Sequence, residues 1–171
     1  AIAVATGGKA LGSVPCEQGD VLYLALEDNN RRLKDRLRTL IPGHLPKLIK
    51  QQDLSRFSAA TTAPKIGSGL IEALDEWRQQ AANPRLIIID TLAVVRPPRR
   101  GNQESYAADY EAATPLQRFA GENGMAVVVV THVRKMEAED PLEMVSGTNG
   151  LTGAADAVLV LNRDATGPKL Y

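Results

Sequence analysis

The sequence has little of several features that mark common protein classes. It contains one cysteine, Cys16, which excludes an internal disulfide, and no metal-ligand spacing surrounds it. Aromatic residues make up only 4% of the chain. Twenty basic residues balance twenty acidic ones, so no net charge draws the whole protein to nucleic acid or to a membrane surface. Any site for a polyanion must therefore be local.

Long apolar runs and targeting signals are also missing. The apolar runs have the length of strands, and the amino terminus lacks a basic segment followed by an apolar one. We therefore expect a cytoplasmic protein with no membrane segment. With 171 residues, 44% of them hydrophobic, the chain is long enough for one domain with a real core and too short for two.

Apolar and amphipathic segments alternate along the chain, as in an α/β fold with a mainly parallel sheet. The patterns predict strands at 21–26, 54–59, 86–89, 125–131 and 157–161, and helices at 1–6, 29–40, 67–82 and 106–123. The strands at 86–89 and 125–131 are continuous apolar runs, which is typical of strands buried on both faces.

Glycine and proline predict where several elements end. Gly7 is expected to cap the helix at 1–6, and Ile41-Pro42-Gly43 to end the helix at 29–40. Pro115 predicts a kink or a new start in the helix at 106–123. Residues 162–168 are expected to form a turn and 169–171 the return strand of a hairpin, and the polar segment 133–150 to form a long functional loop.

Polar side chains follow three of the predicted strands where each strand ends: Glu27-Asp28-Asn29, Asp90-Thr91 and Thr131-His132. Ligands of open α/β sheets bind at the carboxyl edge of the strands, so these groups should meet at one site. Phosphoryl transfer needs a carboxylate on Mg²⁺, a second carboxylate that activates water, and a polar group that senses a terminal phosphate. The pattern therefore indicates this chemistry.

Each of these groups also has a purely structural interpretation. Asp90 could begin a turn, and Asp28 or Asn29 could cap the following helix. His132 could be a hydrogen-bonded structural histidine. These alternatives stay open from the residues alone.

Basic residues cluster in three places. Arg96, Arg99 and Arg100 form one loop cluster, which could contact phosphates or be solvated surface charge. Arg134 and Lys135 open the long polar segment. The basic residues of 31–38 are interpreted as the solvated face of an amphipathic helix.

Four segments together resemble the RecA-like hexameric ATPases, in the branch of RepA-type plasmid replicative helicases and phage AAA_25 ATPases. They are Val21-Leu22-Tyr23-Leu24-Ala25-Leu26-Glu27-Asp28, Leu86 to Leu92, Val127 to Lys135, and Ser146-Gly147-Thr148 through 155–163. The resemblance covers most of the chain in the right order. It implies a three-layer RecA-like P-loop NTPase core with a mainly parallel sheet.

The resemblance also implies a role for each strand-end residue. Glu27 corresponds to the general base, Asp90 in a Walker B segment to the residue that supports Mg²⁺, and His132 to the phosphate sensor. Asp28 and Thr91 would lie at the nucleotide with Asp90.

Further roles fall on later residues. Arg163 is the available stand-in for the arginine finger of this family. Arg134 and Lys135, in the loop 134–149, would face single-stranded nucleic acid. ATP and Mg²⁺ are the implied cofactors, and a homo-oligomer, a hexamer in the parent protein, is the implied assembly.

A phosphate-binding loop of the form G-x-x-x-x-G-K-[ST] is absent from the sequence. Gly7-Gly8-Lys9 does not qualify, because Ala3 stands five residues before Gly8 and Ala10 follows the lysine. We therefore expect 1–171 to be a single partial RecA-like domain, with the P-loop strand missing before residue 1 and a hairpin cut at 171. Since that strand normally lies between those at 125–131 and 157–161, we expect other residues to supply it or these two strands to be displaced.

The resulting prediction is a core fragment of an ATP-hydrolysing, Mg²⁺-dependent motor on single-stranded DNA, of the replicative helicase type. Without a P-loop the fragment itself is expected to be poorly active. One alternative is a recombination or regulatory RecA-like ATPase. The other is a module that binds no nucleotide and only assembles with partners.

Overall fold

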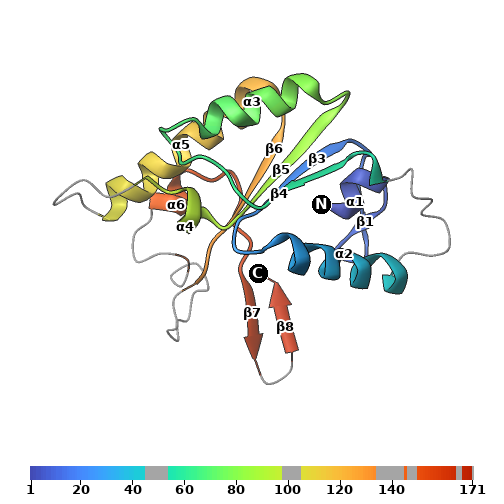
Figure 1. Ribbon diagram of the computed structural model, residues 1–171. Helices are drawn as coiled ribbons and strands as arrows, with labels where there is room; N and C mark the ends of the chain where they lie inside the picture. Colours follow the sequence, from blue (N-terminus) through green and yellow to red (C-terminus); the bar gives the residue numbers. More distant parts are fainter. Residues whose placement is uncertain (45–53, 98–104, 134–144, 146–149, 165–166, 171) are drawn as a thin grey trace.

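A four-stranded parallel sheet forms the centre of the computed structural model, which describes residues 1–44, 54–97, 105–133, 145, 150–164 and 167–170 (Figure 1). Its strands are β3 (Asp20–Ala25), β4 (Phe57–Ala60), β5 (Pro84–Asp90) and β6 (Ala126–Val130), in the order β4-β3-β5-β6. All three neighbouring pairs are parallel. The predicted α/β class with a mainly parallel sheet is confirmed.

Helices lie on both sides of this sheet (Figure 1). On one side are α3 (Leu70–Gln80) and α5 (Ser105–Asn123), and on the other are α1 (Ile2–Thr6) and α2 (Asn30–His44). The single-turn helix α4 (Leu92–Val95) follows β5, and another, α6 (Gly150–Gly153), precedes the C-terminal hairpin. The small antiparallel pairs are β1 (Lys9–Ala10) with β2 (Val14–Pro15), and β7 (Leu161–Asp164) with β8 (Gly167–Leu170).

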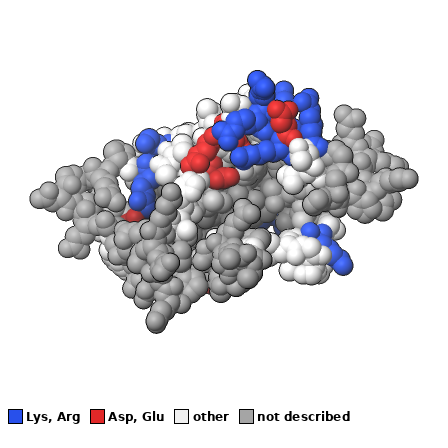
Figure 2. Space-filling model, turned by 90° about the horizontal axis from the view of Figure 1, so that it is seen from below, with Lys and Arg blue, Asp and Glu red and all other residues white. Residues whose placement is uncertain are grey.

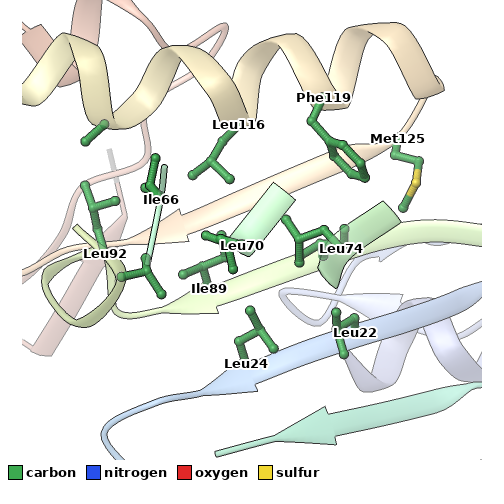
Figure 3. Close-up of a cluster of buried hydrophobic side chains, with 13 residues drawn as sticks. Leu22, Leu24, Ile66, Leu70, Leu74, Ile89, Leu92, Leu116, Phe119 and Met125 are labelled. Atoms are coloured by element: carbon green, nitrogen blue, oxygen red, sulfur yellow. The ribbon is translucent and has the colours of Figure 1, made fainter. Parts of the chain in front are cut away.

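The main core fills the space between the sheet and the α3 and α5 layer (Figure 3). Leu22 and Leu24 of β3 and Ile89 of β5 point into it, where Leu74 of α3 and Leu116 of α5 meet them. Full burial of such a side chain stabilises the fold by about 1.5–3 kcal/mol. Successive strand residues point to opposite faces, so the alternate positions of β3 and β5 face the α1 side.

A smaller cluster covers that second face. Val21 of β3 and Leu86 of β5 pack with Ala5 of α1, and all three are buried. By the same alternation, Tyr23 and Asp90 belong to this face of the sheet. The two strands therefore present apolar residues to both helical layers, as predicted for β5.

Two helix ends match the sequence signals. Gly7 follows α1 with φ 67°, in the left-handed region that glycine adopts without a steric penalty, and the N–H of Gly8 donates to the Ala3 carbonyl at 2.8 Å. Asn29 precedes α2, and its Oδ1 accepts a 2.9 Å hydrogen bond from the Arg32 N–H. Asn29 is thus the N-cap of α2.

Prolines interrupt the helices less than predicted. α2 continues through Pro42 and Gly43 to His44, so its predicted end at 41–43 is wrong. α5 runs as one helix across Pro115. The fixed φ of proline, about −65°, lies in the helical range, so each proline removes one backbone donor without forcing the helix to end.

β6 differs from the prediction of a strand buried on both faces. Val128, Val129 and Val130 are 46%, 36% and 37% exposed, whereas Ile87 and Ile89 of β5 are fully buried. β6 is the last strand of the described sheet and has a partner on one side only. An apolar run shows that a strand can be buried, but burial also requires other segments to cover its faces.

The predicted strand at 157–161 is also wrong. Residues 157–160 form no ladder, Leu159 is 70% exposed, and β7 begins at Leu161. The hairpin exists, but its strands occupy 161–164 and 167–170, where a turn was predicted for 162–168. Among the described strands β6 pairs only with β5 and β7 only with β8, so no described strand lies beside β6 on its open side. Whether other residues supply a strand there stays a prediction. None of the described helices is long and apolar enough to cross a membrane.

Candidate functional site

Three strand ends meet at the carboxyl edge of the sheet, as the sequence predicts. Ala25 of β3 and Val130 of β6 both lie beside Asp90, the last residue of β5. The N–H of Leu26 donates to the Asp90 carbonyl at 2.7 Å, which joins the ends of β3 and β5. The peptide bond from Asp90 to Thr91 is cis. Glu27 and His132 each stand two positions beyond the ends of β3 and β6.

Glu27 is contacted by residues that follow β5 and β6. The buried hydroxyl of Thr91 donates a 2.8 Å hydrogen bond to its Oε1, and Nε2 of His132 lies 3.5 Å from the same oxygen. The Thr91 bond, and then the nearby His132 and Arg32, lower the pKa of Glu27 below its ordinary value. The Glu27 side chain is 48% exposed and that of His132 77%. An ionised, water-accessible carboxylate therefore stands at this edge.

Asp90 is held by a residue that the sequence did not single out as functional. The Tyr23 hydroxyl donates a 2.7 Å hydrogen bond to Oδ2 of Asp90. Burial and this bond raise the pKa of Tyr23 to about 12. The register of β3 against β5 is what identifies Tyr23 as a partner of Asp90. Ala25 lies beside Asp90, and Tyr23 precedes Ala25 by two positions on the same face.

Asp28 points toward α2. Its side chain is only 4% exposed, and Nη1 of Arg36 lies 2.6 Å from its Oδ2. Nε of Arg32 lies 3.3 Å from Oδ1, within ion-pair distance but outside hydrogen-bond geometry. A carboxylate this buried needs such partners. The predicted contact of Asp28 with a nucleotide stays a prediction.

The basic residues of α2 lie on the lower side of the molecule. Figure 2 views that side and shows a cluster of Lys and Arg with carboxylates between them. Arg32, Arg36 and Arg38 pair with Asp28 or Asp35.

Other predicted basic contacts fall elsewhere. Arg96 forms a 2.6 Å ion pair with the buried Asp109 of α5, so this member of the predicted loop cluster joins two parts of the fold. Arg99, Arg100, Arg134 and Lys135 lie outside the described residues. Arg163 is in β7, but its side chain is not among those described.

The donor set at this edge fits Mg²⁺ that is bound together with phosphates. Within the described ranges no group of three or more His, Cys, Asp or Glu side chains could hold a metal ion. Mg²⁺ commonly uses one or two protein carboxylates and takes its remaining ligands from water and substrate phosphates. Asp90 and Glu27 supply hard oxygen donors of that kind, and among described residues only Tyr23 donates to the Asp90 side chain.

Known structures share this fold. One solved ATPase domain has 15% sequence identity and a TM-score of 0.64, with 86% of this chain and 61% of that chain covered. A DnaB-like replicative helicase, in a structure that concerns its interactions with primase, has 14% identity and a TM-score of 0.65, with 86% and 41% covered. The RecA-like fold class is thereby confirmed. This chain spans less than two thirds of either relative.

Sequence comparison defines the family. No curated protein sequence matches the chain significantly. A family model described as an AAA domain, AAA_25, matches residues 1–138 and so includes β3, β5, β6 and the polar residues at their ends. The chain belongs to the AAA_25 family of AAA domains.

Proposed function

We propose that this chain forms the hydrolytic edge of an Mg²⁺-dependent ATPase that drives a motor of the replicative helicase type. The observation that carries the proposal is the meeting of Glu27, Asp90 and His132 at one sheet edge. Membership of an AAA family and the shared fold with a replicative helicase support it.

Glu27 is the proposed general base. Its lowered pKa keeps it ionised at neutral pH, and its exposed side chain can accept a hydrogen bond from water. Thr91 holds one carboxylate oxygen, so the other is available to orient that water. The same lowered pKa limits the strength of the base, which places more of the catalysis on positioning.

Asp90 and His132 are proposed to act on the phosphates. Asp90 would hold Mg²⁺, which neutralises developing charge on the transferred phosphoryl group when bound. His132 is exposed and lies next to Glu27, so a shift of its ring toward a terminal phosphate would change the surroundings of the base. This coupling is how His132 would report the state of the nucleotide.

The remaining parts of the motor are proposed to lie around this edge. A phosphate cradle is proposed to come from residues other than these 171, because the sequence contains no G-x-x-x-x-G-K-[ST]. Arg134 and Lys135 are proposed to contact single-stranded DNA, and Arg163 to reach the nucleotide of a neighbouring subunit in a hexamer. Asp28 is proposed to support the nucleotide site by fixing α2 beneath it.

ATP hydrolysis by the full-length protein, measured with and without single-stranded DNA, tests the proposal. We expect Glu27→Gln to lower kcat by about 10²–10⁴-fold, the usual contribution of a general base, while ATP binding persists. Glu122→Gln on α5 is the matched control, since it removes an exposed carboxylate far along the chain from this edge. Full ATP hydrolysis in Glu27→Gln, or hydrolysis that single-stranded DNA does not change, would contradict the proposal of a helicase-type ATPase.

A further inference from the structure

Tyr23 and Asp90 are diagonal neighbours on one face of two parallel strands. In the register of β3 and β5, Tyr23 lies beside Ile88 and Ala25 lies beside Asp90. Side chains of parallel strands lean along the strand, and an aromatic side chain can reach such a diagonal neighbour. Ala25, between them on this face, carries only a methyl group and leaves the path open. The hydroxyl reaches Oδ2 of Asp90 at 2.7 Å.

The ring and the hydroxyl of Tyr23 have separate tasks. The ring packs beside Phe57 of β4, with centroids 6.4 Å apart. A phenylalanine would fill that space equally well. Only the hydroxyl reaches the carboxylate, and a hydrogen bond to an ionised acceptor is among the stronger ones in proteins. Packing alone therefore does not account for a tyrosine at this position.

The bond restricts the Asp90 carboxylate. With Oδ2 held by Tyr23, rotation about the terminal torsion of Asp90 is limited, and Oδ1 is the oxygen left for a ligand. Groups that hydrogen-bond to a metal-binding side chain commonly set its orientation and its affinity for the metal. Among the described residues, no other side chain bonds to Asp90 in this way.

We propose that Tyr23 is a positioning residue that holds Asp90 in the orientation needed to receive Mg²⁺ with its nucleotide. This inference rests on the proposed function, because it assigns Tyr23 a role only if Asp90 serves Mg²⁺. It adds to the site a residue within β3, outside the polar segment that follows this strand.

The test is a Mg²⁺ titration of fluorescent ATP analogue binding to the full-length protein, which needs no turnover. We expect Tyr23→Phe to raise the Mg²⁺ concentration for half-maximal binding by about 10-fold or more. Binding without Mg²⁺ should stay as in the wild type. Tyr110→Phe is the control, because it removes the hydroxyl of an exposed tyrosine on α5.

The outcomes separate the two claims. Unchanged Mg²⁺ dependence in Tyr23→Phe, together with its loss in Asp90→Ala, overturns the role of Tyr23 and leaves the proposed function standing. Nucleotide binding that is unchanged by Mg²⁺ in the wild type and unchanged in Asp90→Ala overturns both claims. If Tyr23→Phe unfolds at a lower temperature, the titration is done well below its own transition. An unchanged Mg²⁺ requirement there shows a merely structural role, and a raised one supports positioning.

Discussion

The hydroxyl of Thr91 donates a 2.8 Å hydrogen bond to Oε1 of Glu27, although the two residues are 64 positions apart in the sequence. The bond runs from the end of β5 to the end of β3. A second bond runs the other way, from Tyr23 of β3 to Asp90 of β5. Each carboxylate at this edge is therefore held by a hydroxyl from the neighbouring strand, so the two strands position each other's acidic group.

Thr91→Val removes the first of these bonds while keeping the shape of the side chain. We expect the pKa of Glu27 to rise toward its ordinary value, because the Thr91 bond is the largest cause of its lowering. A pKa lowered by folding stabilises the protein at neutral pH, and this contribution is lost as the pH falls through the folded pKa. The stability difference between wild type and Thr91→Val should thus shrink in acid.

Denaturant unfolding of both proteins at neutral and acidic pH measures this effect. Ser68→Ala, which removes an exposed hydroxyl from the turn before α3, is a suitable control. An equal stability difference at both pH values would mean that Thr91 does not act through the charge of Glu27.

Arg32 and Arg36 share the buried carboxylate of Asp28. Loss of one arginine leaves the other in place, so each single alanine variant should lose little unfolding free energy. Loss of both leaves a buried charge without a partner, which costs about 3 kcal/mol or more. The double variant should therefore lose more stability than the sum of the singles, as urea unfolding would show. Adding Asp28→Asn should restore most of that loss, and strict additivity would contradict the shared pairing.

The two apolar strand segments should respond differently to truncation. Ile89→Ala removes a fully buried side chain of β5 and should cost about 2–5 kcal/mol of unfolding free energy. Val128→Ala on β6 changes a side chain that is 46% exposed and should cost less than about 1 kcal/mol. Thermal and denaturant unfolding compare them directly. Similar losses would show that β6 is buried in the protein in solution.

Tyr23 should titrate at unusually high pH. Its pKa is raised to about 12 by burial and by the bond to Asp90, against an ordinary value of 10.0. The stabilisation from this protonated hydroxyl is present below pH 10 and is lost as the pH rises to about 12. Absorbance of tyrosinate should show a late transition that Tyr23→Phe removes. A late transition that survives in Tyr23→Phe would assign it to another residue.

Periodicity in the sequence was enough to locate most of the fold. α3 was predicted from a regular stripe of apolar residues and β5 from a continuous apolar run, and both patterns are visible without a structure. The edge where Glu27, Asp90 and His132 meet followed from the rule that parallel strands end together. These are local patterns combined with one general rule of sheet geometry.

Other features depend on pairing between distant segments, which a single sequence does not specify. The exposure of Val128 depends on what lies beside β6, and the bond from Tyr23 depends on the register of β3 against β5. Asp28 and Asn29 were equal candidates for the cap of α2. The two residues differ by one position relative to the start of α2. As a result Asn29 caps the helix, and Asp28 pairs with arginines.

The proposed function depends on whether this sheet edge receives Mg²⁺ and ATP. Mg²⁺-dependent binding of a fluorescent ATP analogue, measured on the full-length protein and on its Asp90→Ala variant, decides that question without intermediate assumptions. We expect binding that Mg²⁺ strengthens in the wild type, and loss of that Mg²⁺ effect in Asp90→Ala. Equal affinity in both proteins, with and without Mg²⁺, would show that Asp90 does not serve a nucleotide-bound metal.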